Sequence, residues 1–243
     1  METLRETSLI SFEITNRCNM QHIHEKCPIN CRKYKVKEQS LDKWSIVRTI
    51  KMAKKMGFSG MVAFHYYNEP LLEKDLILSI MAEDPSCKYL LWTNGLLLSR
   101  NVLENKFLEQ FTLVCITCYD KVDMPFFQEI RDYYNNVQIF DWELDDRLEI
   151  YNKRVANPLS CKRPLFEIPI DFYGNIHLCC MDWNNSYIIG NIFQEDFTNI
   201  ICSKKYQNII KMCKRRIIDD EICPLICKTC DKMWVSYPRY YDK

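Results

Sequence analysis

The chain has 243 residues, with 33 basic and 32 acidic side chains that give a formal net charge of +1. Hydrophobic residues make up 47% and charged residues 27%, which is typical of globular proteins and excludes disordered and fibrous classes. The balanced charge gives no general electrostatic reason to expect nucleic acid or an anionic membrane as partner. Because no apolar stretch approaches the ~18 residues that a membrane span needs, we expect a cytoplasmic protein without a targeting or anchoring segment.

Cysteine is unusually frequent, with 14 residues in the chain. A chain that is long enough to bury a sizeable core does not need disulfides to stabilise its fold. The clustered thiols therefore predict metal ligands in a reducing compartment.

The N-terminal part alternates between strand and helix patterns. Expected strands cover residues 8–15, 61–65, 88–93, 112–118 and 137–141, and expected helices cover 41–56, 72–83, 101–110 and 125–134. Five strands separated by four helices predict a mainly parallel sheet in a barrel or partial barrel. The chemistry of such sheets lies beyond the carboxyl ends of their strands.

The pattern changes after about residue 148. Two strand-like runs, 168–172 and 175–179, are joined by Tyr173-Gly174 and predict a β-hairpin in a separate module. A segment at 187–192, a helix from 198 to about 216 and a cysteine-rich tail follow.

Cys18, Cys27 and Cys31 lie in the long loop after the first expected strand. Three thiolates bind a metal centre and leave one metal position open for substrate or cofactor, whereas structural zinc prefers a closed set of four ligands. The alternative is a zinc site completed by His22 or His24.

Polar residues also follow the next three expected strands. Glu69, in Asn68-Glu69-Pro70, is suited to receive an ammonium group, and Thr93-Asn94 is suited to meet a ribose. Thr117 follows the fourth strand in the same way. Each motif alone is more typical of an ordinary turn or loop.

Together these features resemble the radical S-adenosylmethionine (SAM) superfamily over about residues 8–145. The resemblance implies an α/β fold with a partial (β/α)6-type barrel over residues 1–147. It also implies a [4Fe–4S] cluster held by Cys18, Cys27 and Cys31. Glu69 matches the family position that receives the amino group of SAM, and the implied cofactor site further includes Asn68, Thr93, Asn94 and Thr117.

The first cysteine motif departs from the family spacing of three and then two intervening residues. His22 occupies the usual second position, and Cys27-Pro28 looks like the usual third cysteine, which would make His24 a ligand and leave Cys31 spare. We favour three cysteine ligands, because thiolates hold iron–sulfur clusters far more often than imidazoles do.

The C-terminal cysteines resemble the SPASM domain and the shorter Twitch extension of radical SAM enzymes. The matching features are Cys161, a hairpin with Gly174, then Cys179, Cys227 and Cys230. The resemblance implies that residues 148–243 form a small Twitch-like hairpin and helix module with an auxiliary [4Fe–4S] cluster on these four cysteines. Cys180 and Cys223 are alternative ligands, and a structural zinc is the alternative metal.

The resemblance implies a radical SAM oxidoreductase that oxidises a small cyclitol or sugar alcohol to a carbonyl, and the size and cluster arrangement resemble those of a dehydrogenase of aminoglycoside biosynthesis. SAM is cleaved to a 5′-deoxyadenosyl radical, the auxiliary cluster accepts an electron, and an external reductase such as flavodoxin or ferredoxin supplies one. Arg154 lies where related enzymes carry an Asn-Arg segment, and either Arg154 or Arg147 faces substrate or both are solvated surface residues. Alternative functions are thioether formation, crosslinking or epimerisation in a short ribosomally made peptide, and a non-catalytic zinc-binding interaction module.

Overall fold

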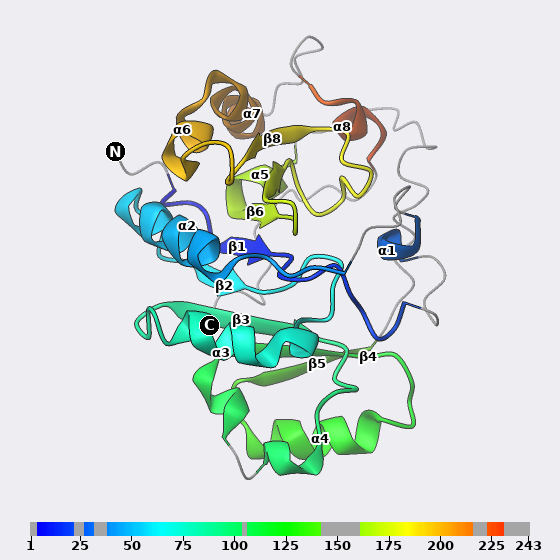
Figure 1. Cartoon of the computed structure of the whole chain (residues 1–243). Helices are drawn as coiled ribbons and strands as arrows, with labels where there is room; N and C mark the ends of the chain where they lie inside the picture. The colour runs from blue at the N-terminus through cyan, green and yellow to red at the C-terminus, as the bar shows by residue number, and fades with distance from the viewer. Residues whose placement is uncertain are drawn as a thin grey trace.

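The structure is a computed structural model that describes residues 4–21, 27–31, 38–103, 106–141, 161–215 and 223–230. The strands in these ranges form one sheet in the order β5-β4-β3-β2-β1-β6-β7-β8 (Figure 1). The strands are β1 Leu9–Phe12, β2 Met61–Ala63, β3 Lys88–Thr93, β4 Leu113–Cys118, β5 Val137–Asp141, β6 Glu167–Ile170, β7 Asn175–His177 and β8 Ile188–Asn191. The predicted α/β fold is confirmed.

Strands β1 to β5 pair in parallel with their neighbours in sequence, as the alternating pattern predicts. Their connections contain α2 (Lys43–Lys55), η1 (Pro70–Glu73) followed by α3 (Lys74–Met81), and α4 (Met124–Tyr133). The helix expected over 101–110 is wrong. Two short 3₁₀ helices, η2 (Arg100–Val102) and η3 (Phe107–Gln110), occupy this connection, and Lys106 before η3 has a φ of 54°. A left-handed residue cannot continue a right-handed helix, which explains the interruption.

A sixth parallel strand is present, but it lies beside β1 rather than beyond β5. Strand β6 pairs in parallel with β1, from Leu9 opposite Glu167 to Phe12 opposite Ile170. Strands β7 and β8 then add in antiparallel order. The predicted hairpin is therefore confirmed, and it continues the same sheet as the N-terminal strands. The expected domain boundary between residues 147 and 148 falls outside the described residues.

The C-terminal helices pack around the hairpin in the upper part of Figure 1. They are α5 (Arg163–Phe166), α6 (Phe197–Cys202), α7 (Lys204–Arg215) and α8 (Leu225–Thr229). The single helix expected over 198–216 is divided into α6 and α7 at Ser203, whose backbone is extended with ψ of 150°. The Ser203 hydroxyl accepts a hydrogen bond from the Tyr206 backbone N–H, 3.2 Å away. Ser203 thus caps the start of the second helix, which offsets the cost of the break.

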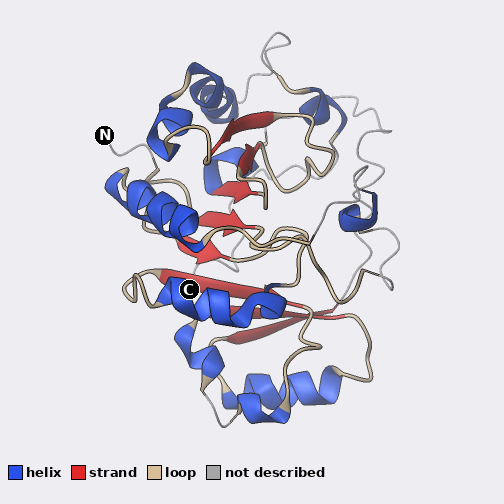
Figure 2. Ribbon diagram, in the orientation of Figure 1, coloured by secondary structure: helices blue, strands red, loops and turns tan. Residues whose placement is uncertain are grey.

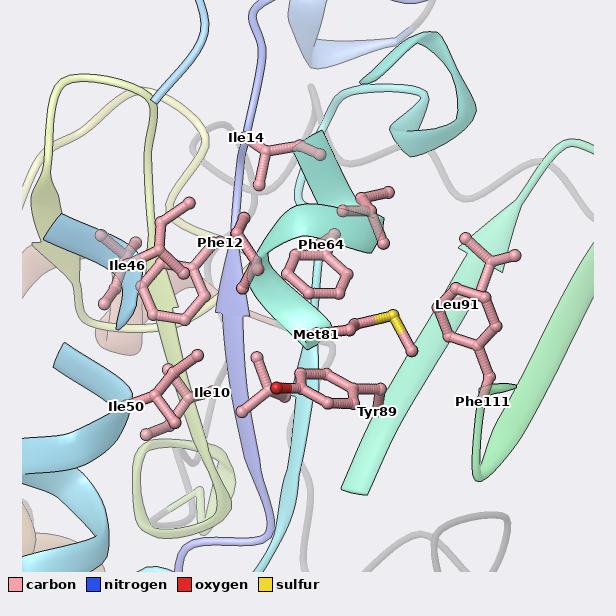
Figure 3. Close-up of a cluster of buried hydrophobic side chains, with 14 of the residues drawn as sticks. Ile10, Phe12, Ile14, Ile46, Ile50, Phe64, Met81, Tyr89, Leu91 and Phe111 are labelled. Carbon is pink, nitrogen blue, oxygen red and sulfur yellow. The ribbon is translucent and has the colours of Figure 1, made fainter. Parts of the chain in front are cut away.

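Alternate residues of the central strands face opposite sides of the sheet. Ile10, Phe12 and Ile14 belong to one buried apolar cluster with Ile46 and Ile50 of α2 (Figure 3), and helices α2 and α3 cover this side of the sheet (Figure 2). A second apolar group, on the other face, contains Leu9, Met61, Ala63, Leu90, Leu113 and Cys115. This two-residue period places both faces of the parallel strands in apolar surroundings. The polar residues that follow the strands are thereby brought to one edge of the sheet.

Within the described ranges, no helix is long and apolar enough to span a membrane.

Candidate active site

Glu69 lies in the connection between β2 and η1 and is anchored to the end of β3. Its side chain accepts hydrogen bonds from the Thr93 hydroxyl at 2.7 Å and from the backbone N–H of Asn94 at 2.9 Å. The Leu71 N–H, 3.0 Å away, also donates to it, so Glu69 caps the start of η1. Only 2% of the residue is exposed. Burial raises the pKa of Glu69 above its ordinary value, while these hydrogen bonds oppose the rise.

The loop that carries Cys18 meets Glu69 and Asn94. The Glu69 backbone N–H donates to the Arg17 carbonyl at 3.0 Å, and the Asn94 side-chain amide donates to the Asn19 side chain at 2.7 Å. Gly95 has a φ of +76°, so the turn after Asn94 uses a conformation that favours glycine. The structure therefore brings the ends of β1, β2 and β3 together, as the parallel sheet predicts.

Cys18 lies half-buried in this group. Burial is the main cause that raises the pKa of Cys18 to about 11, and the charges of Glu69 and Cys27 raise it further. The Met20 N–H, 3.4 Å from the Cys18 sulfur, opposes the shift. Cys18 and Cys27 pack against the same apolar residues, among them Tyr67. Two of the three predicted cluster ligands thus share one environment close to Glu69.

The third predicted ligand, Cys31, ends helix α1 (Pro28–Cys31), and its side chain is outside the described part of the structure. His22 and His24, the alternative ligands, lie outside the described residues, as does Arg154. The ligand set of the first cluster and the role of Arg154 therefore stay predictions.

Two further predicted cofactor residues have structural partners. The Asn68 amide donates to the Phe64 carbonyl at 3.0 Å and accepts from the Tyr66 N–H at 3.0 Å, so it braces the turn before Glu69. The Thr117 hydroxyl accepts a hydrogen bond from the Trp92 indole N–H at 2.9 Å. Asn68 therefore supports the position of Glu69. Thr117 orients the Trp92 ring, which packs on the face of the sheet that carries Leu9 and Met61.

The C-terminal cysteines gather in a second apolar group around the hairpin and helices α7 and α8. This group contains Cys179, Cys180, Cys213, Cys223, Cys227 and Cys230. Cys161 lies near them, because its charge and that of Cys223 raise the pKa of the Cys213 thiol, after burial as the main cause. All these cysteines are free thiols. The four predicted auxiliary ligands are thereby brought to one region of the fold.

The thiols strongly influence one another in this buried setting. The pKa of Cys227 is raised, first by a hydrogen bond with Cys223 and then by burial, and burial raises the pKa of Cys179 well above its ordinary value. Thiolates in an apolar region are costly unless positive charge compensates them, and iron supplies that charge.

Sulfur-only ligands fit an iron–sulfur cluster. Among the described residues, no group of three or more His, Cys, Asp or Glu side chains is arranged to hold one metal ion. This is compatible with a [4Fe–4S] cluster, because each cysteine binds a different iron and the ligands are spread more widely than around a single ion.

Two tyrosines join the region around Glu69 to the C-terminal cysteine group. The sequence analysis did not identify them. The Tyr66 hydroxyl donates to the Cys179 carbonyl at 3.3 Å, and the Tyr67 hydroxyl donates to the Cys180 carbonyl at 2.5 Å. Cys180 packs both with the auxiliary thiols and with the group around Cys18 and Cys27. Their partners lie 113 residues away in the sequence, so local patterns do not indicate these contacts. The position of the two tyrosines directly before Asn68-Glu69-Pro70 was the only signal in the sequence.

The chain is similar to known proteins both in its C-terminal part and over nearly its whole length. Residues 161–231 match the SPASM model, described as an iron–sulfur cluster-binding domain. The chain is 25% identical over 255 residues to S-adenosyl-L-methionine-dependent 2-deoxy-scyllo-inosamine dehydrogenase of Niallia circulans, covering 97% of both chains.

Among solved structures, BtrN in complex with AdoMet and 2-DOIA matches with a TM-score of 0.72 and 24% identity over 93% of each chain. Native anSMEcpe with bound AdoMet and a Cp18Cys peptide matches with a TM-score of 0.55 and 11% identity, over 92% of this chain and 87% of that one. At these identities the structural likeness concerns the fold.

These findings confirm the predicted class, a radical SAM enzyme that carries an auxiliary iron–sulfur domain of the SPASM type. They also favour iron–sulfur chemistry over the alternative of a zinc-binding interaction module. Within the class, the chain resembles the 2-deoxy-scyllo-inosamine dehydrogenase over nearly its whole length, in agreement with the dehydrogenase expected from its size and cluster arrangement.

Proposed function

We propose that this protein oxidises a secondary hydroxyl group of a small cyclitol or sugar to a carbonyl in a SAM-dependent radical reaction. The observation that carries the proposal is the direct connection between the two cysteine sites through Tyr66, Tyr67 and Cys180. Dehydrogenation removes a hydrogen atom and then an electron, so it requires a radical generator and an electron acceptor close together.

The first site is proposed to hold a [4Fe–4S] cluster on Cys18, Cys27 and Cys31, with SAM against Glu69, Thr93 and Asn94. When bound and reduced, this pair supplies a 5′-deoxyadenosyl radical and methionine. The Glu69 carboxylate is fixed by three donors and has further acceptor capacity for the ammonium group of SAM. Its burial excludes water from this contact and strengthens it.

The second site is proposed to hold the auxiliary [4Fe–4S] cluster on Cys161, Cys179, Cys227 and Cys230. When bound there, this cluster would supply an acceptor for one electron. The substrate carbon would give a hydrogen atom to the 5′-deoxyadenosyl radical, the remaining electron would pass to the acceptor, and the hydroxyl proton would go to solvent, which leaves the carbonyl. We further propose a cytoplasmic setting, where a flavodoxin or ferredoxin supplies the electron for SAM cleavage.

The substrate is proposed to be an aminocyclitol, because the similar protein is a 2-deoxy-scyllo-inosamine dehydrogenase. The test uses 2-deoxy-scyllo-inosamine deuterated at its carbinol carbons, with reconstituted enzyme under anaerobic conditions. We expect one 5′-deoxyadenosine per carbonyl formed, with deuterium in the 5′-deoxyadenosine. Two results together would overturn the proposed reaction. The enzyme would form 5′-deoxyadenosine without deuterium transfer from any cyclitol or sugar alcohol, and it would modify a short peptide.

A further inference from the structure

A buried cation lies among the thiols of the auxiliary site. Arg163 is the first residue of α5, two residues after Cys161, and its guanidinium donates a hydrogen bond from Nη1 to the Cys180 sulfur at 2.9 Å. The Arg163 backbone N–H donates to the Cys161 sulfur at 3.4 Å. One residue therefore contacts two sulfur atoms, one of which belongs to the proposed ligand set.

The charge of Arg163 is shielded from solvent. Its side chain is 6% exposed, and a carboxylate oxygen of Glu167 lies 3.6 Å from Nη1. Glu167 is equally buried, with 6% of its side chain exposed. An arginine guanidinium stays protonated in proteins. A fixed positive charge therefore lies within hydrogen-bond distance of the Cys180 sulfur.

A fixed positive charge next to an iron–sulfur cluster stabilises the reduced cluster, because reduction adds one negative charge to it. Hydrogen bonds to the cysteine sulfurs act in the same direction. We propose that Arg163 raises the reduction potential of the auxiliary cluster and that Glu167 limits this rise. This inference rests on the proposed function, in which the auxiliary cluster accepts one electron from the substrate radical.

Two charge-removing variants provide opposite expectations. Arg163→Gln removes the cation and should make reduction of the cluster less favourable, whereas Glu167→Gln removes a nearby negative charge and should make reduction more favourable. Arg163→Lys keeps the positive charge and should retain most of the wild-type potential. A merely structural role for the pair does not predict shifts of opposite sign.

The experiment is a redox titration of the holoenzyme followed by electron paramagnetic resonance, without substrate. The signal of the first cluster is identified by its change on adding SAM, and the other signal is the auxiliary cluster. At a fixed solution potential near the wild-type midpoint, Arg163→Gln should lower the reduced-to-oxidised ratio about tenfold, equal to about 59 mV for one electron. Glu167→Gln should raise the ratio, and Arg131→Gln, which removes an exposed arginine paired with Asp132, should leave it unchanged.

Iron content and circular dichroism establish that each variant holds both clusters and is folded. An unchanged auxiliary midpoint in both Arg163→Gln and Glu167→Gln, or a shift of the same sign in both, overturns the proposal. The absence of a second signal in the wild-type protein would instead overturn the auxiliary site of the proposed function. Because substrate is absent, a failure of the proposed dehydrogenation leaves the potential measurement valid.

Discussion

The Tyr67 hydroxyl donates a hydrogen bond to the backbone carbonyl of Cys180, 2.5 Å away. Tyr67 lies two residues before Glu69 in the connection after β2, and Cys180 follows the proposed auxiliary ligand Cys179. The contact therefore links the cofactor edge of the sheet to the hairpin that carries the auxiliary thiols. We expect this contact to hold the proposed auxiliary site in place relative to the proposed site of hydrogen abstraction.

Tyr67→Phe removes this link while keeping the ring. We expect a loss of about 0.5–1.5 kcal/mol of stability, as for other single hydrogen bonds. The carbonyl formed per 5′-deoxyadenosine should fall, because the auxiliary loop is held less firmly near the substrate. The measurement is that ratio, and Tyr133→Phe, at an exposed position on α4, is the control. A wild-type ratio in Tyr67→Phe would contradict the positioning role.

Glu69→Ala should weaken SAM binding about ten- to a hundredfold, since a charged hydrogen bond contributes roughly 1.5–3 kcal/mol. Glu69→Gln retains one hydrogen-bond acceptor but lacks the negative charge. It should therefore weaken SAM binding less than Glu69→Ala does. The affinity is measured by anaerobic calorimetry on protein with normal iron content. Glu109→Gln, at an exposed position on η3, is the control. Unchanged affinity in both Glu69 variants would remove Glu69 from the cofactor site.

Local patterns were sufficient to predict the first half of the sheet. Strands β3 and β5 have the predicted bounds, because each is a short apolar run between polar turns. The meeting of Glu69, Thr93 and Asn94 follows from the parallel order alone, since neighbouring parallel strands end at the same edge.

Contacts between distant segments were not predictable from local patterns. The sequence of β6 contains nothing that selects β1 rather than β5 as its neighbour, since both are apolar parallel strands. The break at Ser203 was also missed, because the apolar spacing continues across it and only the capping hydroxyl marks it. Arg163 and Cys180 meet through the fold of the hairpin, 17 residues apart.

Replacing Cys227 and Cys230 together by Ala tests the auxiliary site. Two [4Fe–4S] clusters contain about eight iron atoms, and loss of one leaves about four. We expect the double variant to keep the SAM-sensitive cluster and to lose the other. Iron analysis after anaerobic reconstitution measures this, and Cys202→Ala, at an exposed position of α6, should keep the full content. A wild-type value near four that the double variant does not change would contradict the auxiliary cluster.

Asp171 stabilises the turn of the hairpin between β6 and β7 through hydrogen bonds. Its buried carboxylate accepts hydrogen bonds from the Tyr173 N–H at 2.9 Å, the Asn175 N–H at 2.8 Å and the Asn175 side-chain amide at 3.0 Å. His177 Nε2 lies 2.9 Å from it. Burial would raise the pKa of Asp171, but the His177 contact and the hydrogen bonds from Asn175 outweigh burial and lower it.

A carboxylate with a lowered pKa in the folded state stabilises the fold above its ordinary pKa, and this stabilisation is lost as the pH falls through the lowered value. Asp171→Asn should therefore cost about 1–3 kcal/mol at neutral pH, as for a buried polar group that loses a partner. The difference from wild type should narrow as the pH is lowered below the ordinary carboxyl range. Urea unfolding of the iron-free protein, at neutral pH and at a pH below the ordinary carboxyl range, measures this difference in stability. Iron-free protein is used so that release of iron by acid does not affect the result. The control is Asp132→Asn, at an exposed position, whose stability difference from wild type should not change with pH. A loss of stability in Asp171→Asn that is the same at both pH values would contradict the charged state of Asp171.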